Sequence, residues 1–374
     1  MIFTVIGLLP KKEKLMVFES FHGKQYSDSP RAIYEYMREN YPNYKLLWSI
    51  DKRSKPLFET HGIDYIQRFS LKWFFTKPRA HYWINNVRLP KWMPKPRGTV
   101  YLQTWHGTPL KKLGLDIEEI HMPGTKTEQY RQNIISESEN WSFLTSPNKY
   151  SSNIFERAFG FNGEIIESGY PRNDILYTAE KSHVVGIKKK LEIPSNKKVM
   201  LYAPTWRDDD FYEQGKYKFE FQFEIEKMKE RFGSEFVLLT RMHYLIAESF
   251  NFEVYGDFVK DVSSYPDIAE LYLISDLLIT DYSSVFFDYA NLNRPIIFYM
   301  YDLEDYRDRL RGFYFDIERD APGPIVDSEE ELFNAIEYAS KNGHVSTEAF
   351  NSFYERFCYL EDGNSTKRVV DRLI

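Results

Sequence analysis

The sequence predicts an α/β protein made of two Rossmann-like domains, as judged from its length, its composition and the alternation of its apolar segments. The chain has 374 residues, which at about 150 residues per domain suggests two domains with a core each. Hydrophobic residues make up 43% of the chain and charged residues 28%, as in an ordinary globular protein. Short apolar segments alternate with amphipathic ones in both halves, a pattern typical of parallel sheets joined by helices.

The expected elements follow from this alternation. In the first half, strands are expected at residues 15–19, 46–50, 65–69, 82–85 and 100–105. A helix is expected at residues 30–40, with Asp28 or Ser29 as its cap and a proline in its first turn. In the second half, strands are expected at residues 198–203, 236–241, 258–262, 277–280 and 296–299. Helices are expected there at residues 223–232, 267–274, 285–292 and 329–340.

We expect one domain at residues 1–168 and a second at residues 169–374, which includes the terminal helices. The boundary is placed near a Gly-Tyr-Pro turn that follows a strand. Two such domains facing each other across a cleft are the GT-B architecture, and ligands of these sheets bind beyond the carboxyl ends of the strands.

The net charge, the cysteine content and the apolar segments of the chain argue against several classes of function. The net charge of −6 argues against general nucleic-acid binding, and a single cysteine, Cys358, rules out an intramolecular disulfide. The apolar run at residues 1–10 (MIFTVIGLLP) is too short to span a bilayer and lacks basic residues ahead of it. It is expected to be either an interfacial anchor or a first strand.

The first candidate site is the segment TWHGTP at residues 104–109. A strand ends just before His106, and Gly107 is expected to allow a tight turn before a helix. An imidazole at a strand's carboxyl end is suited to general base catalysis near neutral pH. The alternative is a histidine that only bonds its neighbours in the turn. Thr108, in the same loop, is a further candidate for substrate binding.

Two further strand ends carry cationic groups. Arg207 follows the strand at residues 198–203 and is suited to binding a phosphate through two parallel hydrogen bonds. Arg241 and His243 follow the strand FVLLT and, at positions i and i+2, point to one side of an extended segment. Both could neutralise a diphosphate. The alternatives are a surface ion pair of Arg207 with the acidic residues at 208–210 and a structural role for His243.

The segment TDYSS at residues 280–284 joins a strand to a helix. Ser283 and Ser284 are expected to cap that helix, and its first N–H groups can also bind an anion. Neither a GxxxxGK[ST] loop nor a convincing GxGxxG motif occurs, so ATP hydrolysis and an ordinary dinucleotide site are not supported. The histidines are scattered and form no metal motif. The residues require no cofactor, and the question of a bound Mg2+ ion stays open.

Residues 68–97 carry eight lysines or arginines and no acidic residue, with tryptophans between them. Basic residues attract anionic headgroups, and tryptophan favours the membrane interface. The membrane-binding residues expected on this basis are Lys72, Trp73, Lys77, Arg79, Lys91, Trp92 and Lys95. The alternative is an aromatic core beneath a solvated charged face; a nucleic-acid groove gains no support from the rest of the chain.

Eight segments along the chain together resemble the CDP-glycerol glycerophosphotransferase family of teichoic acid synthesis. They are FESFHGKQYSDSP at 18–30, YLQTWHGTPLKKLG at 101–114, SGYPRND at 168–174, YAPTWRDD at 202–209, LLTRMHYL at 238–245, SDLLITDYSSVFFDYANLNRPIIFY at 275–299, RGFYFD at 311–316 and PGPIV at 322–326. Their order and spacing cover nearly the whole chain, which makes the resemblance specific.

The resemblance implies a GT-B fold in which the second domain binds CDP-glycerol. The first domain would face the membrane and an acceptor linked to undecaprenyl diphosphate, so the protein is expected to be peripheral at the cytoplasmic face of the cell membrane. His106 would be the base that deprotonates the acceptor hydroxyl. His243, with Arg207, Arg241, Ser283 and Ser284, would hold the diphosphate as CMP leaves. Asp281 and Asp288 are lesser candidates for supporting that site.

Several alternatives remain at the level of sequence. Ribitol-phosphate transferases share nearly all of these motifs, so a CDP-ribitol ribitolphosphotransferase is the nearest one. A GT-B glycosyltransferase or sugar-nucleotide epimerase would bind UDP- or GDP-sugars instead, and a membrane-associated scaffold would not need the histidines. The larger polymerases have an N-terminal region that this chain lacks, which leaves single addition and polymerisation both open. The abrupt start suggests that a short N-terminal segment is missing.

Overall fold

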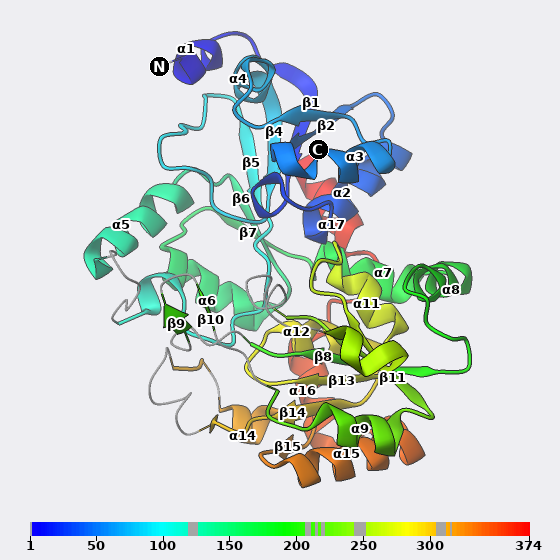
Figure 1. Ribbon diagram of the computed structural model, residues 1–374. Helices are drawn as coiled ribbons and strands as arrows, with labels where there is room; N and C mark the ends of the chain where they lie inside the picture. The colour runs from blue at the N-terminus through cyan, green and yellow to red at the C-terminus, as the bar shows by residue number, and fades with distance from the viewer. Residues whose placement is uncertain are drawn as a thin grey trace. The chain divides into compact units, whose positions relative to one another are not determined.

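The computed structural model describes residues 2–118, 126–205, 211–213, 216–217, 221–242, 252–303, 312–314 and 316–374. The chain forms two compact units. The N-terminal unit comprises Met1–Tyr177 and Tyr359–Ile374, and the C-terminal unit comprises Thr178–Cys358. Each unit is built on one parallel sheet with helices packed on it (Figure 1), so the predicted α/β class with two Rossmann-like sheets is confirmed.

The N-terminal unit contains a seven-stranded sheet in the order β3-β2-β1-β4-β5-β6-β7, with every neighbouring pair parallel. Its strands are β1 Lys12–Glu19, β2 Lys45–Ile50, β3 Tyr65–Gln67, β4 Ala80–Asn85, β5 Val100–Gln103, β6 Phe143–Ser146 and β7 Glu164–Glu167. Successive side chains of a strand point to opposite faces. Met16 and Phe18 therefore join one buried cluster, and Leu15 and Val17 join another. The sheet is buried on both sides.

Helices cover both faces of this sheet. The face of Met16 carries α2 Asp28–Asn40, α3 Lys55–Thr60 and α17 Ser365–Leu373. The face of Val17 carries α1 Ile2–Gly7, α4 Leu71–Thr76, α5 Thr127–Ser138 and α6 Lys149–Phe159. The short helical turns of the unit are η1 Phe21–Gly23, η2 Lys52–Ser54, η3 Lys77–Arg79, η4 Gly114–Asp116 and η5 Pro171–Asn173, followed by α7 Asp174–Thr178.

The last helix, α17, belongs to the N-terminal unit, whereas the sequence placed all terminal helices in the second domain. Its apolar face buries Val369, Val370 and Leu373 in the same cluster as residues of α2. The Asp174 carboxylate accepts the first N–H groups of the helix, from Ser365 at 2.9 Å and Thr366 at 2.7 Å. The unit boundary lies at Tyr177 and again at Cys358, not at residue 168, because the returning chain supplies this apolar face.

The C-terminal unit contains a six-stranded sheet in the order β12-β11-β8-β13-β14-β15. Its strands are β8 Lys198–Ala203, β11 Phe236–Thr240, β12 Val259–Asp261, β13 Leu277–Thr280, β14 Ile296–Tyr299 and β15 Ile325–Val326, and all pairs are parallel. A separate antiparallel pair is formed by β9 Phe211–Glu213 and β10 Lys216–Tyr217. The helical elements are α8 Lys181–Lys190, α9 Ile225–Phe232, η6 Phe252–Phe258, α11 Ile268–Ile274, α12 Val285–Tyr289, η7 Ala290–Leu292, α14 Ile317–Asp320, α15 Glu329–Asn342 and α16 Glu348–Phe357.

Three local predictions differ from the structure. Residues 2–7 form the helix α1, so the expectation of a first strand is wrong. The α2 helix begins at Asp28 with Ser27 as its N-cap, and the side chain of Ser27 makes no capping bond. The strand predicted at 100–105 ends at Gln103 because Trp105 adopts a positive φ of 52°, which ends an extended segment.

Candidate functional site

His106 lies at the carboxyl edge of the N-terminal sheet, as predicted. Asn85, the last residue of β4, is in register with Gln103, the last residue of β5, so the loops that follow the two strands meet at this edge. The turn differs in detail from the prediction. The left-handed residue is Trp105 and not Gly107, and residues 107–113 contain no helix before the short helical turn η4. A bulky residue in this conformation is strained, and such strain is most often found at functional sites.

One nitrogen of the His106 ring is fixed by a backbone carbonyl. Nδ1 lies 2.7 Å from the carbonyl oxygen of Asn86. Because a carbonyl can only accept, Nδ1 carries the proton in the neutral ring, and Nε2 keeps a lone pair. The ring packs against Trp105, with centroids 4.5 Å apart, and against Phe21, at 5.9 Å. The neutral side chain is therefore held in the tautomer that a general base requires.

The protonation of His106 is biased towards the neutral form. The side chain is exposed, yet the surrounding protein desolvates the ring and lowers its pKa below the ordinary value of 6.5. The Asn86 hydrogen bond and the Asp28 carboxylate raise the pKa, whereas Arg172 and Arg88 lower it. Desolvation is the largest of these effects, so the ring is unprotonated at neutral pH and able to accept a proton.

The C-terminal unit brings a second group of predicted residues to its own carboxyl edge. The strands β11, β8 and β13 are neighbours, with Thr240 opposite Tyr202 and Thr280 opposite Ala203. Arg241 directly follows β11, and the segment from residue 281 to 284 directly follows β13. The ends of β8, β11 and β13 are therefore neighbours at one edge of the sheet.

The contacts of two of these residues are structural. The Arg241 guanidinium donates to the carbonyls of Val262 at 3.0 Å and Tyr265 at 2.8 Å, and so holds the loop after β12. Burial lowers the pKa of Arg241. Asp281 is buried, and its Oδ1 accepts the N–H of Thr205 at 2.7 Å, which ties the loop after β8 to the end of β13. Asp281 therefore stabilises this edge of the sheet, and its support of a diphosphate site stays a prediction.

The serine pair is partly exposed at the start of a short helix. Ser284 is the N-cap of α12, but its side chain makes no capping hydrogen bond. The helix expected at 285–292 is α12 for its first five residues and then tightens into η7, so its dipole is weaker than the predicted helix would give. Asp288 is buried within α12, and Thr108 is buried in the loop after His106. Arg207 and His243 lie outside the described residues.

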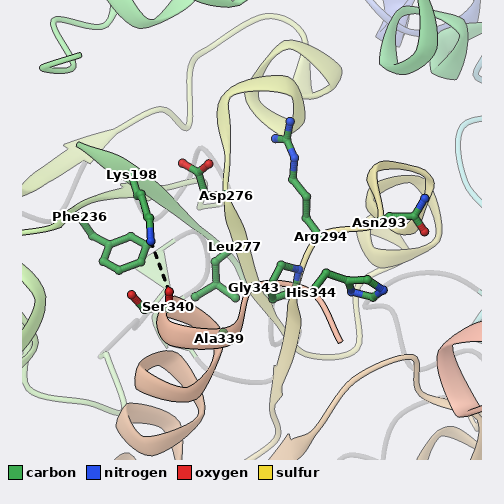
Figure 2. A pocket seen from close by; sticks show the side chains of 11 residues that line it. Lys198, Phe236, Asp276, Leu277, Asn293, Arg294, Ala339, Ser340, Gly343 and His344 are labelled. Atoms are coloured by element: carbon green, nitrogen blue, oxygen red, sulfur yellow. Dashed lines mark hydrogen bonds between the residues drawn. The ribbon is translucent and has the colours of Figure 1, made fainter. Parts of the chain in front are cut away.

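A pocket in the C-terminal unit lies at the opposite edge of the sheet (Figure 2). Lys198, Phe236 and Leu277, the first residues of β8, β11 and β13, line it together with Arg294 and His344. Two of its cationic groups already have partners. Lys198 pairs with Glu235 at 2.6 Å, and Arg294 donates to carbonyls at the end of α11. The pocket is at the amino edge, so it is not part of the candidate site.

The basic segment at residues 68–97 only partly fits the predicted membrane surface. Trp73 and Lys77 are both 0% exposed, so their assignment as lipid-contacting residues is wrong. Lys77 is buried because its ammonium pairs with Glu19, at 3.1 Å, and lies over the rings of Trp73 and Trp83.

Lys95 and Arg79 also make contacts within the protein. Lys95 donates to Ser142 Oγ at 3.2 Å, and burial lowers its pKa. Arg79 donates to the carbonyl of Pro10 at 3.4 Å. Lys72, Lys91 and Trp92 remain exposed.

Large apolar side chains gather at the same end of the N-terminal unit, although no sequence pattern predicted them as one surface. Phe3 of α1 packs on Trp73 and Phe74 of α4 and on Trp92, with ring centroids 5.4, 6.4 and 6.1 Å apart. The helices α1 and α4 are therefore neighbours, as Figure 1 shows. We define the apolar corner as the exposed residues Ile2, Val5, Leu8, Leu9, Phe69, Leu71, Phe75 and Trp92.

The apolar corner holds eight of the fifteen large hydrophobic side chains that are exposed in the described part of the chain. Leu8 is 83% exposed and Leu71 is 76% exposed. None of the described helices is both long and apolar enough to cross a bilayer. Likewise, the described ranges contain no group of three or more His, Cys, Asp or Glu side chains that could hold a metal ion.

The two parallel sheets, with the His106 imidazole at one carboxyl edge and the Ser283–Ser284 hydroxyls at the other, fit a two-domain α/β transferase of the GT-B kind. Residues 1–374 match the family model described as CDP-Glycerol:Poly(glycerophosphate) glycerophosphotransferase. The chain belongs to this family and is an enzyme of its class.

Individual relatives agree with this family. The chain is 54% identical over 371 residues to the teichoic acid poly(glycerol phosphate) polymerase of Bacillus subtilis strain 168, covering 99% of this chain and 50% of that protein. It is also 54% identical to the protein of the same name from Bacillus spizizenii, covering 100% of this chain and 95% of that one. The solved structure of the wall teichoic acid polymerase TagF is 40% identical, with a TM-score of 0.90 and coverage of 100% and 92%.

The chain thus spans about half the length of the Bacillus subtilis relative and nearly all of the Bacillus spizizenii one. The resemblance in fold to TagF extends over both units, which agrees with the GT-B architecture predicted from the sequence.

Proposed function

We propose that the enzyme transfers glycerol phosphate from CDP-glycerol to a terminal hydroxyl of a teichoic acid acceptor linked to undecaprenyl diphosphate, with release of CMP. The observation that carries the proposal is the His106 ring, whose Nδ1 is engaged by a carbonyl while Nε2 stays available. Names of close relatives supply the polyol, since both Bacillus proteins are poly(glycerol phosphate) polymerases. The same catalytic domain is compatible with adding one unit or many.

In the proposed step, the acceptor oxygen attacks the phosphorus atom that bears glycerol. His106 Nε2 takes the hydroxyl proton as the new P–O bond forms, and the bond from that phosphorus to the CMP oxygen breaks. CMP leaves with the bond's electron pair, so the negative charge that develops on it must be stabilised by positive or N–H groups. The proposal assigns this role to Arg207, His243 and the Ser283–Ser284 segment, whereas Arg241, which the sequence also predicted to bind the diphosphate, holds the loop after β12.

Donor specificity tests this proposal. Purified protein is incubated with a prenyl-diphosphate acceptor carrying a glycerol phosphate end, and CMP or UDP release is measured with CDP-glycerol, CDP-ribitol and UDP-N-acetylglucosamine. We expect CMP from CDP-glycerol at a kcat/KM at least about 10-fold above that with CDP-ribitol, because a site fitted to one polyol discriminates against a longer one.

The control omits the acceptor, which should abolish product because the attacking hydroxyl is then missing. CMP release from CDP-ribitol alone would show a ribitolphosphotransferase, and UDP release would show a glycosyltransferase. The proposed step draws on no cofactor. Chelation of Mg2+ in the same assay tests whether an ion helps to neutralise the diphosphate.

We further infer that the apolar corner docks the enzyme on an anionic membrane, where a lipid-linked acceptor would be presented at the cytoplasmic face. Exposed leucine and aromatic side chains gain free energy when they enter the interface. Lys72 and Lys91 are exposed beside them and would attract anionic headgroups. The surface revises the membrane-binding set predicted from sequence, since it draws on α1 and excludes Trp73 and Lys77.

Vesicle binding tests the docking proposal. Leu8→Asp combined with Leu71→Asp is expected to weaken sedimentation with phosphatidylglycerol-containing vesicles by at least about 10-fold, because two large side chains no longer enter the interface. Lys72→Gln with Lys91→Gln should weaken binding mainly at low salt. Val185→Asp is the matched control, since Val185 is 65% exposed but belongs to the C-terminal unit. Unchanged binding by the double leucine variant would remove the apolar corner from docking.

A further inference from the structure

Strained backbone conformations concentrate around His106. Seven non-glycine residues have positive φ in the described part of the chain. Four of them lie around His106: Trp105 at 52° precedes it, Phe21 at 44° packs on its ring, His22 at 61° follows Phe21, and Asp28 at 63° acts on the ring electrostatically. Such conformations persist only where neighbouring groups hold them in place.

Asn86 is the residue that joins these segments. Its backbone carbonyl accepts from His106 Nδ1, and its side-chain Oδ1 accepts the N–H of Phe21 at 2.9 Å. Its Nδ2 donates to Ser20 Oγ at 3.2 Å and to Asp28 Oδ2 at 3.1 Å. The side chain is 0% exposed. Asn86 is therefore bonded to the loop after β1, to the start of α2 and to the His106 ring at once.

A buried ion pair fixes Asp28, the residue that accepts a hydrogen bond from the Asn86 side chain. Arg172 Nη1 lies 3.4 Å from Asp28 Oδ1, and both residues are 8% exposed. The guanidinium carbon of Arg172 lies 4.0 Å from the centre of the Tyr170 ring. The Asp28 carboxylate also accepts the N–H of Ser29 at the start of α2. Its two oxygens are thus fixed, one towards Arg172 and the other towards Asn86.

We propose that Arg172, Asp28 and Asn86 are positioning residues that hold His106 with Nδ1–H bonded to the Asn86 carbonyl and Nε2 directed towards the acceptor hydroxyl. The proposal rests on the proposed function, in which His106 is the base. None of the three residues touches substrate in this scheme. They fix the carbonyl that selects the tautomer of the imidazole, and a misplaced base costs rate even when the donor still binds.

A purely structural role for these residues would make a different prediction. The charges that act on His106 come from Asp28 of α2, Arg172 of η5 and Arg88 of the loop after β4. Asp28 favours the protonated ring, and Arg172 disfavours it. Removing one charge or the other should therefore move the His106 titration in opposite directions, which a general loss of stability would not do.

The experiment measures kcat/KM against pH with CDP-glycerol as the donor. The acid limb of this profile is the fall in activity at low pH as His106 becomes protonated. We expect it to move to lower pH in Asp28→Asn and to higher pH in Arg172→Gln, each by about 0.5 pH unit or more. Arg172→Lys keeps the charge and should bring the limb back to its wild-type position. Asn86→Ala is expected to lower kcat by about 10- to 100-fold, with the KM for CDP-glycerol changed by no more than about 3-fold.

Arg157→Gln is the matched control, because Arg157 pairs with Asp116 at 2.9 Å in the same unit but does not act on His106. The proposal would be overturned if the acid limbs of the Asp28→Asn and Arg172→Gln profiles stayed at the wild-type pH or moved in the same direction. If Asp28→Asn fails to fold by circular dichroism, the Arg172→Gln and Arg172→Lys pair decides the matter alone. Failure of the proposed function would appear separately, as missing CMP release by the wild type or full turnover by a His106 variant.

Discussion

Replacement of His106 by alanine is expected to lower kcat by about 10²- to 10⁴-fold, while CDP-glycerol binding persists. The physical reason is that the acceptor hydroxyl is a weak nucleophile unless a base takes its proton, and Nε2 of this ring is free to do so because Nδ1 is bonded to Asn86. CMP release measures turnover, and calorimetric titration with CDP-glycerol measures binding. A loss of both together would indicate a folding defect instead of a lost base.

The matched control for this prediction is His61→Ala. The His61 ring also places Nδ1 against a main-chain carbonyl, that of Leu57 at 2.8 Å, but it is exposed at the end of α3. Its loss should leave kcat unchanged. The wild-type enzyme should also lose activity as the pH falls through the pKa of His106, and this acid limb should lie below pH 6.5 because desolvation lowers that pKa. Unchanged turnover by His106→Ala would remove the residue from the mechanism.

The sequence was sufficient to place residues at strand ends. His106, Arg241 and Ser283 each follow an apolar segment that was predicted to be a strand. Because the parallel strands of one sheet end at the same edge, this position places each residue at the carboxyl edge of its sheet. The structure confirms this placement within each unit. The prediction succeeded because burial of a strand on both faces leaves a continuous apolar run that is easy to recognise.

No comparable sequence pattern identified the residues proposed to position His106. Asn86 and Asp28 are 58 positions apart in the chain, and Arg172 is 144 positions from Asp28. Their contacts depend on three loops meeting at one sheet edge, which no local pattern encodes. The motifs quoted for the family resemblance do contain Asp28 and Arg172, but Asp28 was considered only as a helix cap and no role was predicted for Arg172.

The basic segment shows how a correct pattern can receive the wrong interpretation. Interleaved tryptophan and lysine residues suggested an interface, but Trp73 and Lys77 are core residues. The partner that draws Lys77 inside is Glu19, 58 positions earlier at the end of β1. A buried lysine is rare unless it is paired, and the pairing depends on β1 and η3 being brought together by the sheet.

The largest expected effect on stability comes from this buried pair. Lys77→Met is expected to lower the free energy of unfolding by about 3–5 kcal/mol, because it leaves the Glu19 carboxylate with less compensation in the interior. Methionine approximates the length of the lysine stem, so the cavity left between Trp73 and Trp83 is small. A melting temperature lower by on the order of 10 °C should be seen by differential scanning calorimetry.

Lys72→Met is the control, since Lys72 lies on the exposed side of the same segment. It should change the melting temperature by less than about 2 °C. A loss of less than about 1 kcal/mol in Lys77→Met would show that Arg68, which lies 3.3 Å from Glu19 Oε1, compensates the carboxylate alone.

The pKa shifts of the pair indicate why a second substitution should restore stability. Burial raises the pKa of Glu19, but Lys77 and Arg68 outweigh it and bring the pKa below 4.5, so the ionised carboxylate depends on its partners. Burial lowers the pKa of Lys77 below 10.5 even with Glu19 beside it, so the pair does not fully offset the dehydration of the ammonium. Glu19→Gln in the Lys77→Met background removes the uncompensated charge and should recover at least about half of the lost stability. No recovery would mean that lost packing, and not the unpaired carboxylate, is the origin of the loss.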